Sequence, residues 1–590
     1  MIKDPKKTKK VIIGIDLGTT YSSVAIIRNG FVEILSSSSG SRSIPSYVTY
    51  GDEIMVGDTA KDQAIFYPTS SIFDSKRMLG RKFHDPHIQN DMKLWPFKVV
   101  GVGSDNVMIQ VNFQNKVKEI SPIEISSEIL KHLKAIAEEY LGSEVSVRDA
   151  VVTVPAYFTP LQIQETIKAG ELAGLNIVRT LPEPIAATIA YGIKEQSENV
   201  RNIFVFDFGG GTLDVSILKV KGNDFEAVAS NGDMHLGGQD FDNNLIEYFA
   251  KILNDKKKID IHGNQRAMFL MRSACEKTKK TLSQTQSTRI FIPSLINGID
   301  FVESIKRSTF NEINEGLYSK IIAPIEDVLN EACLQKTDID QIVFVGGSSR
   351  IPKVAEIIEQ YFNKERTINK NIDSDTAVVT GAAIVAANIL KKEEEDEDDV
   401  PIIPTTPQDP TTQTTPQDPT TPITPTTQTT PQDPTTQTTP QDPTTPITPT
   451  TQTTPITPIT PTIPITPTIP IINYHSVLAH SIGIEVNRKC MHTMLKKGLK
   501  LPAKSQSSYF SPMIANKNSL ALKVFSGENR ETVYNTELGK FHIQNLSMKD
   551  NRGAIKVVFL VDINGILNVE VEDIYAEEGG KKNFKVYLQN

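Results

Sequence analysis

The chain has 590 residues, enough for several domains, and its 39% hydrophobic and 22% charged residues are typical of globular proteins. A net charge of -8 gives no basic surface for nucleic acid, and no apolar run is long enough to span a membrane. Three widely separated cysteines form neither a disulfide framework nor a zinc motif, so we expect a cytoplasmic protein that binds neither nucleic acid nor membrane.

Two similar stretches in the first part of the chain predict a phosphate site. VIIGIDLGTTYSSVAII (11–27) and IFVFDFGGGTLDVSIL (203–218) each join two strand-like runs through a turn of glycine and threonine. Glycine lets backbone N–H groups approach an anion, and the aspartate ending each first strand, Asp16 or Asp207, is suited to hold the waters of Mg²⁺. Either turn alone fits an ordinary hairpin, but the pair favours two like halves facing each other across a nucleotide cleft. Neither turn contains a P-loop or dinucleotide-binding motif.

The composition changes after about Leu390. An apolar helix pattern, AVVTGAAIVAANIL, leads into KKEEEDEDD, a block of like charge that favours disorder. TTPQDPTTQTTPQDPTTPITPTTQ at 405–428 is then repeated unchanged at 429–452. Pro/Thr-rich sequence favours extended polyproline II, so we expect a solvated spacer, which between Pro404 and Pro470 would reach roughly 200 Å at about 3.1 Å per residue. An SH3 or WW docking site at Pro419–Pro422 and phosphorylation at Thr-Pro steps are alternatives.

The residues after about Asn473 predict an all-β unit of short alternating runs. The unit ends in a hairpin from Val557 to Glu572, folded about Asn564 and Gly565. An Asn-Gly pair between two apolar alternating runs is a strong signal for a tight hairpin turn.

Three motifs, GIDLGTTYSSV, VFDFGGGTLDVSIL and VFVGGSSRIPKV, resemble the nucleotide-binding signatures of the seventy-kilodalton heat-shock chaperones. The resemblance continues through VVTVPAYF, HLGGQDFDN and CEKTKKTLS, and resumes after the repeats at SIGIEV and VVFLVDINGILNVEVED. It implies an α/β actin-like, two-lobed ATPase domain at 11–390, an acidic and Pro/Thr-rich disordered linker at 391–472, and a mostly-β sandwich that binds peptides at 473–590.

The resemblance also implies which residues bind and hydrolyse ATP. Lys76 would position the attacking water and offset charge on the γ-phosphoryl group, while Asp16 and Asp207 would hold Mg²⁺ through water. The implied catalytic set is Lys76, Asp16, Glu183, Asp207, Thr212 and Asp214. The implied nucleotide-binding set is Gly18, Thr19, Thr20, Tyr21, Gly209, Gly210, Gly211, Thr212, Glu276, Lys279, Lys280, Ser283, Gly346, Gly347, Ser348, Arg350 and Asp375. The implied cofactors are ATP or ADP with Mg²⁺, and K⁺ is a further candidate.

In the tail, the resemblance implies a pocket for an extended apolar peptide, lined by Ile484, Tyr509, Leu520 and Leu522. Alternation alone fits ordinary sandwich core at least as well. Asn487 stands where the family usually has Met or Ala in an arch over the peptide, so we expect a weaker cover there.

Several departures from the family bear on signalling between the domains. The positions of the family's short apolar docking linker read INYHS here and follow the repeats. Ile163 replaces an arginine and Pro182 an asparagine of the domain interface, and Lys280 replaces an arginine that stacks on the base. The chain stops at Asn590, where the family continues into a helical lid. We therefore expect weakened interdomain signalling and J-domain docking, and fast release of peptide.

Two functions remain open from the sequence. The first is an ATP-driven chaperone for unfolded or nascent polypeptides, working with a J-domain co-chaperone and a nucleotide-exchange factor. The second is a nucleotide-binding adaptor like the ribosome-associated relatives, without a peptide cycle of its own. The intact phosphate turns and carboxylates favour the first, and the altered linker and missing lid favour the second. A sugar kinase on the same scaffold is disfavoured because the tail matches chaperones.

Overall fold

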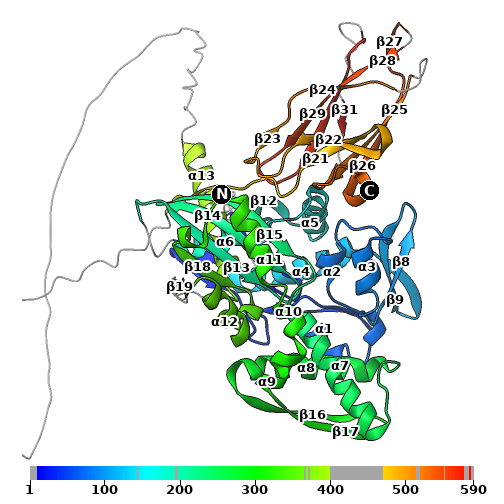
Figure 1. Ribbon diagram of the computed structural model, residues 1–590, viewed down its shortest axis with the longest axis vertical. Coiled ribbons are helices and arrows are strands. Elements are labelled where there is room, and N and C mark those ends of the chain that lie inside the picture. Colours follow the sequence, from blue (N-terminus) through cyan, green and yellow to red (C-terminus); the bar gives the residue numbers. More distant parts are fainter. Residues whose placement is uncertain are drawn as a thin grey trace, which may run out of the picture. The chain divides into compact units, whose positions relative to one another are not determined.

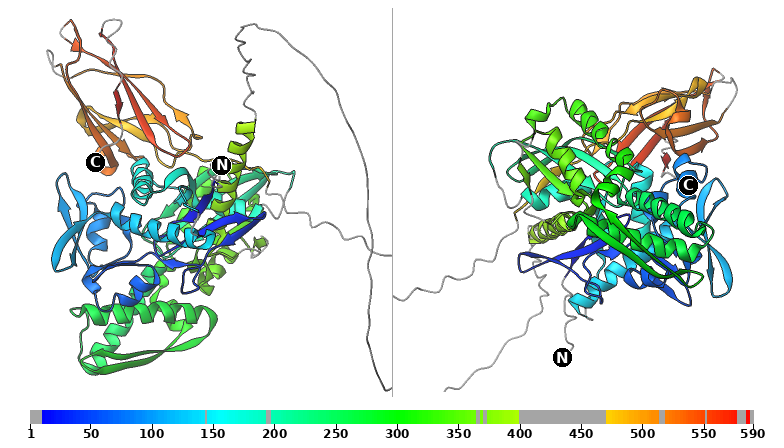
Figure 2. Two further views of the ribbon diagram at one scale, coloured as in Figure 1. Left: turned by 180° about the vertical axis from the view of Figure 1, so that it is seen from behind. Right: turned by 60° about the horizontal axis from the view of Figure 1, so that its bottom comes forward.

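The computed structural model describes residues 10–142, 145–192, 197–363, 367–369, 373–398, 470–512, 518–550, 552–576 and 584–586. The chain divides into two units, one formed by Met1–Glu395 with Pro467–Asn590 and the other by Asp396–Thr466. The Pro/Thr repeats, the candidate SH3 or WW site and the Thr-Pro steps of the repeats lie outside the described residues, so what the sequence predicts of them stays a prediction. The first unit is drawn in Figure 1 and Figure 2.

Lobe I is built on a mixed sheet whose strands run in the order β12-β11-β1-β2-β3, with β4 paired to β2. Strands β1 and β2 form the first predicted hairpin, and β11 lies parallel to β1. The strands are β1 (Ile12–Asp16), β2 (Tyr21–Arg28), β3 (Phe31–Ile34), β4 (Ile44–Pro45), β11 (Asp149–Val154) and β12 (Asn176–Pro182). Asp16 therefore stands at the carboxyl end of a central strand.

Helices and two small sheets complete lobe I. Helices α4 (Pro122–Leu141) and α5 (Pro160–Leu172) each begin at a capping box, made by Ser121 and by Thr159. The short helix α2 (Ser75–Met78) carries Lys76. The remaining elements are β5 (Val48–Tyr50), β6 (Ile54–Val56), α1 (Asp58–Gln63), η1 (Pro68–Ser70), β7 (Ser71–Ile72), α3 (Pro86–Asp91), β8 (Lys98–Val102), β9 (Asn106–Phe113) and β10 (Lys116–Ile120).

Lobe II repeats this plan with the strand order β19-β18-β13-β14-β15-β20. Strands β13 and β14 form the second predicted hairpin, with Asp207 opposite Asp214, and β18 lies parallel to β13 as β11 does to β1. The strands are β13 (Arg201–Phe208), β14 (Leu213–Lys221), β15 (Asp224–Asp233), β18 (Gln341–Val345), β19 (Thr367–Asn369) and β20 (Asn473–His475). The two lobes are thus similar halves, as the paired turns predict.

Helices α6 (Glu183–Gly192) and α13 (Ala377–Asp398) join the lobes. One hydrophobic cluster contains Ile12 and Val151 from lobe I together with Val205 and Val343 from lobe II. The other elements of lobe II are α7 (Gly238–Lys257), α8 (Gln265–Gln284), β16 (Ser287–Ile296), β17 (Ile299–Lys306), α9 (Arg307–Ile313), α10 (Glu315–Tyr318), α11 (Ile322–Glu331), η2 (Lys336–Asp338), η3 (Gly347–Arg350) and α12 (Pro352–Tyr361).

The start of the predicted linker differs from the structure. Helix α13 continues to Asp398, so the linker start at 391 falls inside a helix. Two of the glutamates there have a lysine partner. Lys391 Nζ lies 4.0 Å from Glu395 Oε1, and Lys10 Nζ lies 2.7 Å from Glu393 Oε2. Helical pairs of opposite charge support the helix that the acidic block alone would disfavour.

The end of the predicted linker also differs. β20 (Asn473–His475) pairs in parallel with β15, and Ile472 just before it is buried, with its N–H donating to Asn388 Oδ1 of α13 at 3.1 Å. The INYHS positions therefore dock on lobe II, so Asn473–His475 belong to its sheet and not, as the boundary at 473 predicts, to the β-sandwich. β20 covers the edge of β15, which would otherwise expose unpaired backbone groups.

The rest of the chain forms a β-sandwich. One sheet has the order β22-β21-β25-β26, and the other has β23-β29-β30-β31 with β24 paired to β29. The elements are β21 (Ile482–Val486), η4 (Asn487–Lys489), β22 (Cys490–Leu495), β23 (Ala503–Lys504), β24 (Ser508–Phe510), β25 (Leu520–Ser526), η5 (Thr532–Tyr534), β26 (Thr536–Ile543), β27 (Met548–Lys549), β28 (Arg552–Gly553), β29 (Ile555–Val561), β30 (Leu567–Asp573) and β31 (Phe584–Val586).

The predicted hairpin is present in the second sheet. Strands β29 and β30 are antiparallel and joined by the Asn564-Gly565 turn, in which Gly565 has φ 80°. That left-handed conformation explains why glycine stands there. In the part of the chain that the structure describes, no helix is both long and apolar enough to cross a membrane.

Candidate functional site

The two predicted phosphate turns meet across the cleft between the lobes. A Cβ added at Gly210 would lie 2.0 Å from Thr20 Oγ1, and one at Gly211 would lie 2.9 Å from Thr19 Cγ2. Only glycine permits this approach of one turn to the other. The sequence therefore places small residues where the two halves of the site touch.

A cavity of about 710 Å³ opens beside the turns. Its volume lies in the range of pockets that hold small molecules. Every residue of the predicted nucleotide-binding set lines it, as do Lys76, Asp16, Glu183 and Asp207. Asp214 is not part of the lining and instead accepts a hydrogen bond from Thr212 Oγ1 at 3.2 Å. The structure thus brings the predicted catalytic and nucleotide-binding residues to one place.

The ammonium group of Lys76 is buried against Glu183. Lys76 Nζ lies 2.6 Å from Glu183 Oε1 and 5.6 Å from the centre of the Phe158 ring. Lys76 comes from α2 of lobe I, and Glu183 is the first residue of α6. A buried ammonium in a polar cavity is a candidate for stabilising charge that develops on a bound phosphoryl group.

Three aspartates at the ends of the central strands lie near this pair: Asp207 and Asp214 are buried, and Asp16 is half-buried. Burial, and then repulsion by Glu183, raises the pKa of Asp16 to about 7, although Lys76 and Thr153 act in the opposite direction. Burial and nearby carboxylates also raise the pKa of Asp207 and of Asp214 well above the usual range. Such a group of carboxylates favours a bound cation or bound protons.

The donor groups of this region fit Mg²⁺, which prefers oxygen ligands. Asp214 Oδ1 is buried and has no hydrogen-bond partner among the described residues. Within those residues, no three His, Cys, Asp or Glu side chains are grouped closely enough to bind a metal ion directly. Asp16 and Asp207 would hold such a cation through water, and it would supply positive charge beside the phosphate turns.

At the opposite end of the cavity, Glu276 connects the lobes. Its carboxylate lies 2.7 Å from Lys61 Nζ and 2.7 Å from Lys280 Nζ, and it accepts a hydrogen bond of 2.6 Å from the Tyr21 hydroxyl. Burial would raise the pKa of Glu276, but the two ammonium groups lower it far below its usual range. Glu276 is therefore a fixed negative charge shared by both lobes.

Sequence reasoning missed two cations of the site. Lys61 lies 215 positions from its partner Glu276, and no local motif marks it. Arg77 donates from Nη2 to the Gly211 carbonyl at 2.7 Å and so ties lobe I to the second phosphate turn. Its position next to Lys76 was the only signal that could have found it.

The four predicted peptide-binding residues differ in their exposure to solvent. Ile484 and Leu522 are 0% and 2% exposed and pack in the core between the two sheets. Tyr509 is 66% exposed on β24, and Leu520 is half-buried at the start of β25. The core interpretation, which alternation allowed, is thus what the structure shows for Ile484 and Leu522.

The β-sandwich contacts lobe I through its hairpin turn. Thr180 Oγ1 donates to the Asn564 carbonyl at 2.8 Å, and a Cβ added at Gly565 would lie 2.7 Å from Ile163 Cδ1. Leu161 of α5 belongs to the same hydrophobic cluster as the sandwich core. Ile163 therefore makes an apolar contact at the interface where an arginine would bring a charge.

Comparison with known proteins agrees with this architecture. The family model described as Hsp70 protein matches residues 12–447 and 471–588. The chain is 38% identical over 581 residues to Heat shock 70 kDa protein 2 of Paracoccidioides lutzii, covering 98% of this chain and 76% of that protein. It is 37% identical to Heat shock 70 kDa protein of Emericella nidulans (98% and 78% covered) and 38% identical to Heat shock cognate 70 kDa protein 3 of Dictyostelium discoideum (95% and 78% covered). The predicted resemblance and fold class are confirmed, and the chain belongs to the Hsp70 family of ATP-hydrolysing chaperones.

Proposed function

We propose that this chain hydrolyses ATP between its lobes and uses the cycle to bind and release unfolded or nascent polypeptides through its β-sandwich. The observation that carries the proposal is the buried Lys76–Glu183 pair, 2.6 Å apart, in one cavity with both phosphate turns. An adaptor that only binds nucleotide has no use for a buried ammonium beside the phosphate turns.

In the proposed reaction, the turns Gly18–Tyr21 and Gly209–Thr212 bind the phosphates through N–H groups and hydroxyls. Lys76 offsets charge on the γ-phosphoryl oxygens and, with Glu183, orients the attacking water. Asp16 and Asp207 would hold Mg²⁺ through water, and this ion would neutralise part of the phosphate charge. K⁺ is a further candidate cofactor beside the phosphates.

Single-turnover hydrolysis tests these roles. Lys76→Ala should slow hydrolysis by about a hundredfold or more, because preorganised charge at the phosphoryl group is lost, while ATP binding measured by calorimetry persists. Lys93→Ala is the matched control, since Lys93 is exposed and bonds only Asn90 in α3. Hydrolysis at the normal rate in Lys76→Ala would refute the proposed reaction.

For the sandwich, we propose that Leu520 takes part in holding the peptide. Stimulation of hydrolysis by an extended leucine-rich heptapeptide should disappear in Leu520→Asp, because a charged group would enter an apolar contact. Val533→Asp, at a site 67% exposed in η5, should leave stimulation intact.

The second candidate is an adaptor without its own peptide cycle. It is favoured by the closed packing of Ile484 and Leu522, which leaves these two side chains no surface for a peptide. Hydrolysis that ignores the heptapeptide in the unmodified chain would support the adaptor. For either function we propose a J-domain co-chaperone and a nucleotide-exchange factor as partners. We also propose a cytoplasmic location, since the described cysteines form no disulfide.

A further inference from the structure

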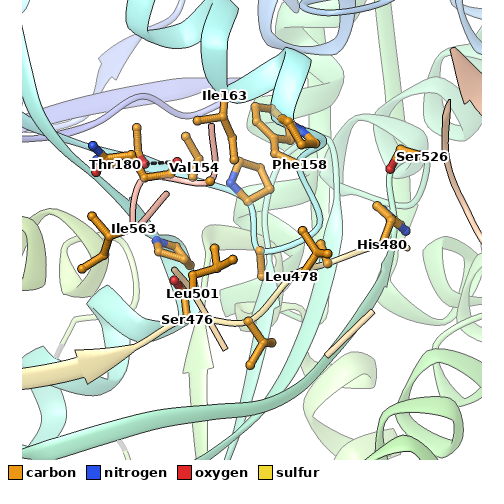
Figure 3. A pocket seen from close by; sticks show the side chains of 18 residues that line it. Val154, Phe158, Ile163, Thr180, Ser476, Leu478, His480, Leu501, Ser526 and Ile563 are labelled. Carbon is orange, nitrogen blue, oxygen red and sulfur yellow. Dashed lines mark hydrogen bonds between the residues drawn. The ribbon is translucent and has the colours of Figure 1, made fainter. Parts of the chain in front are cut away.

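The segment that follows β20 runs from lobe II to the β-sandwich and, together with residues of lobe I, lines a small cavity of about 40 Å³. Figure 3 shows Val154, Phe158 and Ile163 of lobe I facing Leu478 and Leu501 across it. The lining is mainly apolar, so a polar side chain at its margin needs its own partner. His480 is that side chain.

His480 bonds to lobe I through one defined contact. Its Nε2 lies 3.1 Å from the carbonyl oxygen of Tyr157. A carbonyl can only accept, so Nε2 carries the hydrogen and the imidazole donates. This bond joins the sandwich segment to the loop that follows β11.

Tyr157 carries the contact toward the catalytic carboxylates. Its ring is buried, and its hydroxyl lies 3.4 Å from Asp214 Oδ2 and donates to it. Thr212, which bonds the same carboxylate oxygen, adjoins this hydroxyl. The next residue, Phe158, lies under the ammonium of Lys76. One short loop thus touches His480 on one side and three members of the proposed catalytic set, Asp214, Thr212 and Lys76, on the other.

We propose that His480 is a positioning residue, whose neutral imidazole latches the β-sandwich to Tyr157 and through it orients Asp214, so that docking and ATP hydrolysis both respond to protonation of this one ring. The effect on hydrolysis rests on the proposed function, while the latch itself does not.

The charged groups that face His480 only partly offset the cost of burying its protonated form. Lys497 and Glu331 pair with each other at 2.6 Å, and Glu528 accepts hydrogen bonds from the backbone N–H and hydroxyl of Ser481. Burial lowers the pKa of His480, and Lys497 acts in the same direction, against the Tyr157 carbonyl and the two carboxylates. An added proton would therefore sit in the interface without a carboxylate of its own.

The direction of the pH effect follows from this. In an undocked sandwich the imidazole has its ordinary pKa of about 6.5, and docking lowers it. The latch is therefore fully effective above about pH 6.5 and weakens as the pH falls, by at most about tenfold in the docking equilibrium per pH unit.

Hydrogen exchange of the 590-residue chain with Mg-ATP tests the latch between about pH 5.5 and 7.5, after correction for intrinsic exchange. Protection of residues 156–158 and 476–481 should fall below about pH 6.5 in the unmodified chain. His480→Gln keeps an N–H donor but does not titrate, so its protection should stay constant. His480→Leu should also lose the pH response, and His475→Gln, on an exposed residue of β20, should keep it.

At saturating Mg-ATP, single-turnover hydrolysis should change over the same pH interval in the unmodified chain, and the change should be smaller in His480→Gln, in which Asp16 still titrates. A constant protection in the unmodified chain, or an unchanged pH response in His480→Gln, would overturn the proposal. Hydrogen exchange does not depend on ATP hydrolysis. It therefore tests the latch even if Lys76→Ala shows that the proposed reaction is wrong.

Discussion

The nucleotide cleft and the β-sandwich differ in where their predicted site residues lie. In the cleft, polar residues from both lobes line one cavity of about 710 Å³. In the sandwich, the side chain of Ile484 is buried in the core, and that of Tyr509 is exposed to solvent. Two matching glycine and threonine turns, each beside an aspartate, together predict an anion site, whereas an apolar residue in a strand fits a core and a pocket equally well.

The largest expected effect is at the cleft. Glu183→Gln should reduce single-turnover hydrolysis by about a thousandfold, because Lys76 loses the carboxylate 2.6 Å away that holds it in place. ATP affinity should change little, which separates loss of chemistry from loss of binding. Equal losses of rate and affinity would show that Glu183 only maintains the cavity.

In the sandwich, a core residue and an exposed one should differ in stability. Ile484→Ala should lower the free energy of unfolding by about 2–5 kcal/mol, because it leaves a cavity between the sheets. Tyr509→Ala should change it by about 0.5 kcal/mol or less. Scanning calorimetry measures both, and similar values would mean that Ile484 faces an open pocket in solution.

The buried carboxylates of the cleft predict a pH dependence. Asp16 must be ionised to hold a hydrated cation, and its pKa is about 7, so Mg-ATP affinity should fall by up to about tenfold per pH unit below pH 7. Because this pKa is raised above the value of 3.8 expected in the unfolded chain, the nucleotide-free protein should lose stability as the pH rises from about 4 to about 7, with no further loss above that. Calorimetric titrations and melting curves measure the two effects, and Asp16→Asn should reduce both.

At the base end of the cleft, two lysines share one carboxylate and should differ in importance. Lys61 is 22% exposed and links the lobes, while Lys280 is 59% exposed and lies four residues from Glu276 on the same helix. Lys61→Ala should speed nucleotide release about five- to tenfold, and Lys280→Ala only about twofold. Stopped-flow release of a fluorescent nucleotide distinguishes them.

The smallest effect is expected from the Pro/Thr repeats. Deleting residues 405–452 should change the docking of β20 on β15 by about 1 kcal/mol or less, since closing a connection costs only roughly 0.6 kcal/mol for each doubling of its length. Hydrogen-exchange protection of Asn473–His475 measures this change in docking. A large loss of protection would mean that the repeats themselves contact the lobes.

The two lobes and their turns could be predicted from the sequence because the geometry of each turn requires particular residues. These are a glycine where the backbone approaches closely, as at Gly18 and Gly210, and an aspartate at the end of the strand, as at Asp16 and Asp207. The sequence could not predict Lys61, because its partner comes from the other lobe. Its pattern also did not predict the docking of β20, since Asn473–His475 lack the apolar character of a buried strand. The strand docks because it pairs with the otherwise free edge of β15. Ile484 could be assigned to the sandwich but not to core or pocket, because alternation does not distinguish them.

The anchoring of Ile472 on Asn388 has a consequence for how this chain tolerates variation. Helix α13 and strand β20 are both fixed to the ATPase domain, so the repeats enter and leave from one body and do not set the separation of the two domains. A duplicated string such as TTPQDPTTQTTPQDPTTPITPTTQ could gain or lose copies in related strains while the path from nucleotide to peptide keeps its length. Repeat number is then free to change under selection unrelated to the ATP cycle.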